Sequence, residues 1–279
     1  MNNIAVVSGT TGVGKSSLAH NLAAMQAIRG QRVRGIGLDR QCTLSLWNGI
    51  DLDPDDGALY VGDVLQRKRR IKTGEVDDRG KPVKRPVHFA DVEWQTPIPR
   101  YTLIPEAREL EYDMLKIAQM GGCAEVLKTE VRDASPVDTN WFDTPGGANP
   151  LSLAALAAAD WIIVVVCPTP KGVQIGETLQ WIEEMQEDGK TQAELVGIVP
   201  NIVPAVREGG AYQDVMDQLN APAEEGGYAD MLLPAIRKQH YEITAFAMSR
   251  PLAAAFPRAE ITADYEDLLK DLDRRGVTK

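Results

Sequence analysis

Short apolar runs alternate with longer, helix-favouring segments along most of the chain. Apolar runs of four to eight residues indicate buried strands, whereas apolar residues three or four positions apart indicate helices packed on a core. Strands are predicted at residues 4–7, 31–38, 100–105, 140–143, 161–167 and 195–199, with an edge strand at 231–233. Helices are predicted at 18–29, in 61–72, over 106–128 with a break at Gly121-Gly122, and at 151–159, 174–187, 212–219 and 265–275.

This alternation predicts the fold class. A strand, a helix and a second strand within about forty residues form a βαβ unit, which requires parallel strands. We therefore expect an α/β fold with a doubly wound, mostly parallel sheet and helices on both faces. No repeat or convincing linker interrupts the pattern, so residues 1–279 are expected to form one domain.

The loop between the first predicted strand and helix carries a phosphate-binding motif. Residues 9–16 fit G-x-x-x-x-G-K-[ST], the P-loop. Its glycines let backbone N–H groups wrap around phosphate oxygens, and the following helix directs its positive end at them. Lys15 is expected to reach the β- and γ-phosphates, and the Ser16 hydroxyl to ligate Mg²⁺. The predicted nucleotide-binding residues of this loop are Thr11, Gly12, Val13, Gly14, Lys15, Ser16 and Ser17.

Two aspartates complete the predicted site. Asp39 and Asp143 each follow a predicted strand, and the carboxyl ends of parallel strands meet at one sheet edge. Phosphoryl transfer needs acids near the metal and the attacking water. The alternative for both is an ordinary turn-forming aspartate. The Gly146 backbone N–H, three residues after Asp143, is expected to contact the γ-phosphate and make this loop a nucleotide-state switch.

Charge is distributed unevenly along the chain. The 279 residues carry a formal net charge of −10, which disfavours a protein that coats DNA generally but allows a local basic patch. A concentrated basic segment, Arg67 to Arg85, stands out in this acidic background. It is interpreted either as a solvated loop or as a contact for nucleic acid or an acidic partner.

Cysteine content and the apolar pattern indicate the compartment. The three cysteines show no metal-ligand spacing and are expected to be free thiols in a reducing cytoplasm. The amino terminus shows no signal peptide, and the longest apolar run, 161–167, is too short to span a bilayer. A cytoplasmic protein is therefore expected.

Several segments together resemble the ParA/MinD family of P-loop ATPases, especially ParA partition proteins. Residues 12–23 resemble the family's P-loop and first helix, 38–41 its switch I, and 142–145 with 153–160 its switch II and following helix. The resemblance implies a cofactor pair of ATP and Mg²⁺ and an ATP-dependent homodimer. It also implies slow hydrolysis stimulated by a ParB-like or other partner, and binding of DNA without sequence preference.

The resemblance also implies residue roles. Asp39 corresponds to the switch I aspartate that organises Mg²⁺ and the attacking water, so it is the predicted catalytic acid and a metal ligand with Ser16. Asn201 resembles the adenine-contacting asparagine, with a turn-forming residue as the alternative, and Pro234 lies near the expected base-binding loop.

The chain departs from the family pattern at three positions. Thr10 stands where the family usually has a signature lysine that reaches the partner's nucleotide, a lysine that some carboxysome-positioning members also lack. Lys171 is the predicted substitute, with a solvated loop lysine as the alternative. Gly37 replaces the first switch I aspartate, and Arg40 replaces a proline.

The leading hypothesis is a ParA-like ATPase that partitions plasmid or chromosome DNA or positions a cargo. Its DNA contacts are predicted at Arg207, Arg237 and Lys238, which would make it nucleoid-associated. A MinD-like membrane cycle is disfavoured because residues 264–275 are acidic, so no membrane partner is expected. A biosynthetic P-loop ligase would need a small-acid pocket, and a GTPase an N-K-x-D motif that is absent. A nucleotide-gated binding module that has lost hydrolysis stays open because of Thr10 and Gly37.

Overall fold

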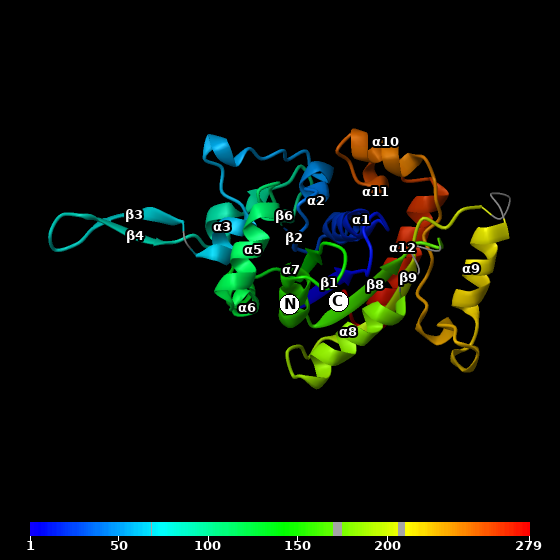
Figure 1. Ribbon diagram of the computed structural model, residues 1–279. Coiled ribbons are helices and arrows are strands. Elements are labelled where there is room, and N and C mark those ends of the chain that lie inside the picture. Colours follow the sequence, from blue (N-terminus) through cyan, green and yellow to red (C-terminus); the bar gives the residue numbers. More distant parts are fainter. Residues whose placement is uncertain (68, 170–174, 206–209) are drawn as a thin grey trace.

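A seven-stranded sheet forms the centre of the molecule (Figure 1). The computed structural model describes residues 1–67, 69–169, 175–205 and 210–279. The strand order is β5-β6-β2-β7-β1-β8-β9, and every neighbouring pair is parallel except the antiparallel pair β5–β6. The strands are β1 Asn2–Val7, β2 Val33–Gly37, β5 Trp94–Gln95, β6 Tyr101–Ile104, β7 Thr139–Asp143, β8 Trp161–Val166 and β9 Glu194–Pro200.

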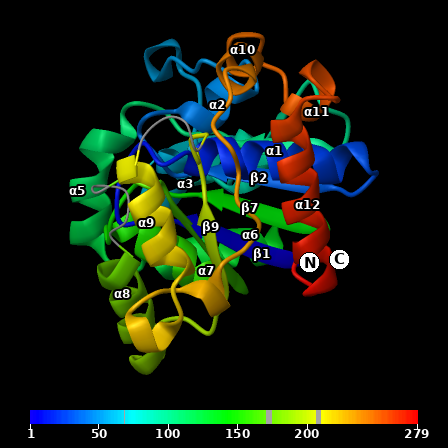
Figure 2. The ribbon, with the colours of Figure 1, turned by 90° about the vertical axis from the view of Figure 1, so that its right-hand side faces the viewer.

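Helices cover both faces of this sheet (Figure 2). The helices of the first half of the chain are α1 Lys15–Ile28, α2 Thr43–Trp47, α3 Val61–Gln66, α4 Phe89–Val92, α5 Leu110–Met120 and α6 Cys123–Asp133. Those of the second half are α7 Pro150–Ala158, α8 Ile175–Glu187, α9 Gly210–Asn220, α10 Tyr241–Ala247, α11 Leu252–Ala255 and α12 Glu260–Arg274.

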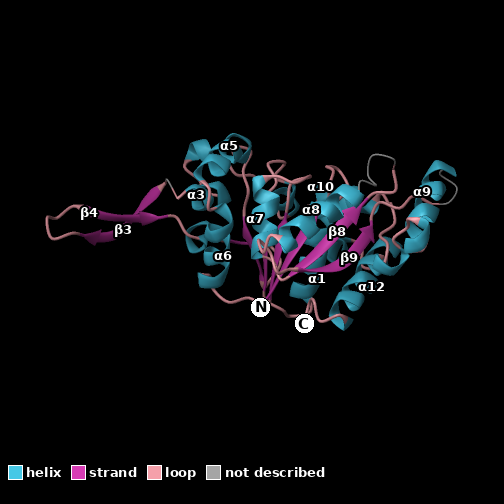
Figure 3. Ribbon diagram, turned by 60° about the horizontal axis from the view of Figure 1, so that its bottom comes forward, coloured by secondary structure: helices cyan, strands magenta, loops and turns pink. Residues whose placement is uncertain are grey.

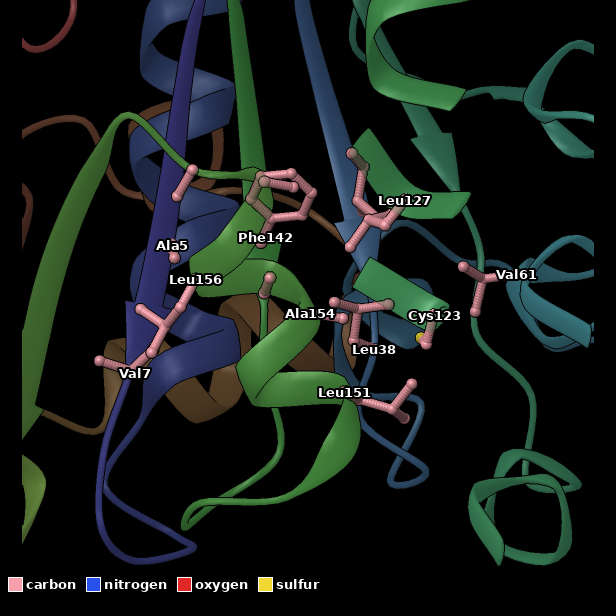
Figure 4. Packing of buried hydrophobic residues seen from close by; sticks show 14 of the residues in the cluster. Ala5, Val7, Leu38, Val61, Cys123, Leu127, Phe142, Leu151, Ala154 and Leu156 are labelled. Atoms are coloured by element: carbon pink, nitrogen blue, oxygen red, sulfur yellow. The ribbon is translucent and has the colours of Figure 1, made fainter. Parts of the chain in front are cut away.

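The core lies in two layers, one on each face of the sheet. Successive side chains of a strand point to opposite faces, and β1 shows this directly. Ala5 and Val7 belong to one apolar cluster, and Ile4 and Val6 belong to the other. Figure 4 shows Ala5 and Val7 packed near Leu156 of α7. The predicted doubly wound fold is therefore confirmed.

The basic segment forms an antiparallel hairpin outside the main sheet. Strands β3 (Arg70–Val76) and β4 (Pro82–Pro86) pair only with each other in the described structure. The hairpin projects from the side of the molecule where α3 lies (Figures 1 and 3). The segment is therefore a ribbon and not a loop, and most of its strand residues are exposed.

The predicted edge strand at 231–233 is wrong. Residues Ala229–Met231 form a 3₁₀ turn, and Leu232 makes only an isolated parallel bridge with Ile198. Pro234 follows immediately and has no N–H to continue a ladder. Shorter elements, namely α2, α4, α10, α11 and β5, were not predicted. No helix within the described ranges is long and apolar enough to cross a membrane.

Candidate nucleotide-binding site

The P-loop joins β1 to α1 at the carboxyl edge of the sheet. Gly12 and Gly14 have φ angles of 77° and 87°, in the left-handed region that glycine adopts without a Cβ penalty. A Cβ on Gly14 would also overlap the side-chain amide of Asn201. The motif's glycines are thus required by backbone conformation and by close packing.

A cleft of about 1130 Å³ opens beside this loop. It brings together residues from the P-loop, switch I, switch II and α5, which are distant in sequence. The predicted site residues that line it are Thr11, Gly12, Gly14, Lys15, Ser16, Ser17, Asp39 and Gly146. Its volume is of the order of a small-molecule site, roughly 300–1,000 Å³, so the cleft can accommodate a nucleotide.

Lys15 is buried at the base of the cleft. The residue is 4% exposed, and its Nζ donates to the Thr10 carbonyl at 3.1 Å. Burial lowers the pKa of Lys15, while the nearby carboxylates of Asp143 and Asp39 oppose that shift. Thr10, at the position of the family's signature lysine, therefore contributes its backbone oxygen to the loop, and no charge.

Asp143 ends β7 beneath the P-loop and is fully buried. Neither carboxylate oxygen has a hydrogen-bond partner within the described residues. Burial raises the pKa of Asp143. The nearby Ser16 hydroxyl and the Lys15 charge oppose that shift, and the Glu106 and Asp39 carboxylates add to it. A buried carboxylate without partners is costly, and this one faces the region where Lys15 and Ser16 lie.

The oxygen donors here fit Mg²⁺. Ser16 and Asp39 line the cleft, and Mg²⁺ typically takes one or two carboxylates together with phosphate oxygens and waters. No group of three or more His, Cys, Asp or Glu side chains in the described part of the chain is placed to hold a metal by itself. The donor set is thus one that would share a metal with a bound phosphate.

Switch II packs directly on the P-loop. The Gly147 N–H donates to the Ser8 carbonyl at 2.8 Å, and the Thr144 hydroxyl donates to the Val6 carbonyl at 2.7 Å. A Cβ on Gly146 would lie 2.7 Å from the carbonyl carbon of Thr10. The switch II backbone therefore approaches the phosphate-binding loop as closely as glycine permits.

Residues 4–240 match the sequence profile of the CobQ/CobB/MinD/ParA nucleotide-binding domain. The chain belongs to this family. The chromosome-partitioning ATPase Soj of Thermus thermophilus is 27% identical over 197 residues, which cover 70% of this chain and 67% of Soj. The maintenance of carboxysome distribution protein A of Synechococcus elongatus is 27% identical over 207 residues, or 72% of each protein. The ATP complex of a Cyanothece McdA variant has a TM-score of 0.78 at 18% identity and covers 100% of this chain and 98% of that one.

In this ParA/MinD-family chain, switch I is fixed by local contacts. The Asp39 side chain accepts the Gln41 N–H at 3.0 Å, and the Asp39 carbonyl accepts the Cys42 N–H at 3.0 Å. Arg40 pairs with Glu111 of α5. The arginine that replaces the family's proline thus ties switch I to the helix that forms one wall of the cleft.

Sequence analysis of this ParA/MinD-family chain missed Glu106. This residue follows β6 and is 1% exposed, and it accepts hydrogen bonds from the Ser45 N–H at 3.1 Å and the Ser45 hydroxyl at 2.9 Å. Burial raises the pKa of Glu106 to about 7, against the opposing effect of the Ser45 hydrogen bonds. Its carboxylate fills the space beside Gly37, so an acid is present there although residue 37 supplies none.

A second missed carboxylate lies under the P-loop helix. Glu242 of α10 accepts the Ser17 hydroxyl, and the Tyr265 hydroxyl donates to it at 3.1 Å. Burial raises the pKa of Glu242. This contact fastens α10 and α12 to the start of α1.

The predicted base-binding residues lie on neighbouring segments, since the Leu233 and Ile236 N–H groups donate to the Ile198 and Pro200 carbonyls, but neither residue lines the cleft. Asn201 is fully buried, and its amide donates to the Val13 carbonyl at 2.8 Å, while its Oδ1 has no partner within the described residues. Val13 is itself buried and lies behind the cleft rather than in its lining. Pro234 lies in a different depression, beside Asp267 and Lys270 of α12.

The structure describes only some of the predicted DNA-binding residues, and it does not describe the lysine that is predicted to reach the partner's nucleotide. Lys171 and Arg207 lie outside the described residues. Arg237 is engaged within the chain: its guanidinium donates to Asp264 at 2.7 and 2.9 Å and to Glu260 at 2.7 Å. Lys238 lies next to it in a shallow depression.

Proposed function

We propose that this chain is a ParA-like ATPase that binds Mg²⁺–ATP and hydrolyses it slowly to position plasmid, chromosome or another cargo. One observation carries the proposal: the buried carboxylate of Asp143 lies with Asp39 at the P-loop, beside Lys15 and Ser16. Acids at neighbouring strand ends, facing a buried lysine, form the arrangement that phosphoryl transfer requires.

The roles follow from the positions. The P-loop backbone N–H groups and Lys15 would hold the phosphates. Ser16 and Asp39 would hold Mg²⁺, which neutralises charge that develops on the phosphate oxygens. Asp39 would also orient the attacking water, and Gly146, packed on Thr10, would present its N–H to the γ-phosphate. Asn201 fixes the P-loop through its hydrogen bond to the Val13 carbonyl.

ATP turnover under single-turnover conditions tests this proposal. We expect Asp39→Ala to bind ATP but lose hydrolysis by about 10²-fold or more, since it removes water positioning and a metal ligand. Lys15→Ala is expected to lose nucleotide binding itself. Asp188→Ala, in the exposed turn after α8, is the matched control. Equal and negligible turnover of the unmodified protein and Asp39→Ala, with ATP still bound, would leave a nucleotide-gated binding module.

The dimer is part of the same proposal. With Thr10 in place of the signature lysine, a charge that stabilises the partner's phosphates must come from another residue, and we propose Lys171. Light scattering with ATP, ADP and no nucleotide tests this. An ATP-dependent dimer whose turnover falls in Lys171→Ala, with ATP affinity retained, is expected, whereas unchanged turnover would remove Lys171 from the site.

The partner we propose is nonspecific DNA, with a ParB-like or other protein that stimulates hydrolysis. Such a protein would act in the cytoplasm on the nucleoid. The terminal helix α12 supports this over a membrane cycle, because its apolar residues are buried against the body: Tyr265, Leu268, Leu269 and Leu272. A helix whose apolar face is already packed has none to insert into a bilayer.

A further inference from the structure

The β3–β4 hairpin carries the largest unexplained charge on the molecule. Residues 69–86 contain seven lysines and arginines against three acids, although the whole chain is acidic at −10. The hairpin extends away from the sheet and its helices (Figures 1 and 3). An isolated two-stranded hairpin has little stability of its own in water. A projecting hairpin therefore needs contacts at its base, here called its root, that anchor it to the body of the protein.

Three arginines supply the root. Arg85 pairs with Asp91 of α4 through two hydrogen bonds at 2.5 and 2.7 Å. Arg69 lies 3.3 Å from Asp63 of α3, and Arg67 lies 3.8 Å from Glu130 of α6. Ile71 packs on the apolar core at the same end. These basic residues are therefore occupied in fixing the hairpin to the body.

Three other basic residues of the two strands form a separate exposed face. Arg70, Lys72 and Lys84 share this face, because Lys72 pairs directly with Lys84 across the ladder and Arg70 is two residues from Lys72. All three are exposed, and none makes an ion pair with an acid of the described residues. Like charges directly opposite each other destabilise a hairpin, so this pairing favours an external anion.

The acids of the hairpin do not cancel this face. Glu75, Asp77 and Asp78 all lie at or near the tip. Asp77 is used in the turn, where its carboxylate accepts the N–H groups of Arg79 and Lys81 at 2.9 and 2.8 Å. The stem face of Arg70, Lys72 and Lys84 thus stays uniformly positive.

We infer that this stem face is a contact surface for the backbone of duplex DNA. Two-stranded ribbons fit the major groove of B-DNA, and lysine and arginine contacts to phosphate supply nonspecific affinity. The segment has no aromatic residue on which unpaired bases could stack, which argues against single strands. The inference rests on the proposed DNA binding and locates it away from Arg237, whose guanidinium is occupied by Asp264 and Glu260.

The root of the hairpin is linked to the nucleotide cleft through α3 and α5. Tyr60, which caps α3, donates its hydroxyl to Asp113 of α5. The same turn of α5 carries Glu111, which pairs with Arg40 of switch I. The helices that position the hairpin are therefore in contact with the wall of the cleft that switch I touches.

The test compares two triple variants of matched composition. The hairpin variant combines Arg70→Gln, Lys72→Gln and Lys84→Gln. The body variant combines Lys128→Gln, Arg132→Gln and Lys190→Gln, which line a depression at the amino ends of β1 and β8. A charge-preserving variant, Lys72→Arg with Lys84→Arg, controls for effects on the hairpin's own folding. ATP turnover without DNA is expected to be equal in all of them.

Binding to a random-sequence duplex is followed by fluorescence anisotropy with ATP at about 50 and 200 mM salt. We expect the hairpin variant to bind about tenfold or more weakly at low salt, with a salt slope smaller by about two to three. The body and charge-preserving variants are expected to match the unmodified protein. A hairpin variant that binds DNA normally overturns the inference. Binding to polyglutamate is measured in parallel, and a hairpin variant that loses only that binding also overturns the inference, because it would indicate an acidic protein partner.

The outcome separates this inference from the proposed function. DNA binding that depends on ATP but not on the hairpin removes the inference and leaves the ATPase account intact. DNA binding that depends on the hairpin but not on nucleotide keeps the inference and removes the ATP gating. An unmodified protein that binds no duplex in any nucleotide state overturns both.

Discussion

The carboxylate of Glu106 occupies the space that a side chain on Gly37 would fill. Gly37 ends β2 and Glu106 follows β6, the neighbouring parallel strand. The chain thus lacks an acid at the first switch I position and places one there from the adjacent strand. The Ser45 N–H and hydroxyl hold this carboxylate in place. A substitution at Gly37 therefore affects Glu106 directly.

Substituting Gly37 alone is expected to be destabilising. Gly37→Asp would bring a second buried carboxylate against Glu106, and we expect a loss of about 1–3 kcal/mol of unfolding free energy from overpacking and like charge. Adding Glu106→Ala to that variant is expected to restore most of the loss, because the new aspartate then takes the vacated space. Urea denaturation of the two single variants and the double variant measures this coupling. Additive effects would contradict it.

Glu106 also predicts a pH dependence. Its pKa is about 7 in the folded protein and about 4.5 when unfolded, so the folded state binds the proton more tightly. The stability contribution of the protonated group is complete below pH 4.5 and is lost as the pH rises toward 7, by up to about 3 kcal/mol. Glu106→Gln cannot ionise, so it does not lose this stability. Its free energy of unfolding relative to that of the unmodified protein is expected to rise by the same amount as the pH rises over this range. The exposed Glu125→Gln is the control, and a flat difference curve for Glu106→Gln would refute the prediction.

Gly146→Ala is expected to impair the nucleotide site. The added Cβ would lie 2.7 Å from a backbone atom of Thr10, so the P-loop or switch II must move. A displacement of about 1 Å costs on the order of 10²-fold in turnover. Gly176→Ala in α8, where a Cβ meets nothing within 4 Å, is the matched control. Turnover of Gly146→Ala equal to that of the control would show that this packing does not matter.

Arg237→Gln is expected to lower stability without weakening DNA binding. It removes the hydrogen bonds to Asp264 and Glu260, and we expect a loss of about 1 kcal/mol after solvent screening. Arg258→Gln, an exposed arginine with no ion pair within the described residues, is the control. Thermal unfolding measures the first effect. A DNA affinity that drops for Arg237→Gln at a temperature where both variants are folded would instead return Arg237 to the DNA contact.

The sequence was sufficient to predict the fold class and the phosphate-binding loop, because both depend on local patterns. The P-loop spacing identifies its own chemistry, and Asp39 and Asp143 could be placed because parallel strands end at a common edge. The ParA/MinD resemblance was confirmed by the family match over residues 4–240.

Features that depend on packing between distant segments could not be predicted. Glu106 has no motif of its own, and its position depends on β6 lying beside β2. In the stem of the β3–β4 hairpin, charged residues interrupt the apolar ones, so it lacks the apolar run that identifies buried strands. Its turn did have a signal, the Asp77 to Gly80 sequence, in which Gly80 adopts a φ of 72°.

The most direct test of the account is binding to random-sequence duplex DNA by fluorescence anisotropy with ATP, ADP and no nucleotide, at two salt concentrations. The account predicts salt-sensitive binding with ATP only, since we propose that ATP in the cleft between the P-loop and both switches sets the DNA-binding state. Binding that is equal in all three states, or absent from all three while ATP turnover is intact, would contradict it.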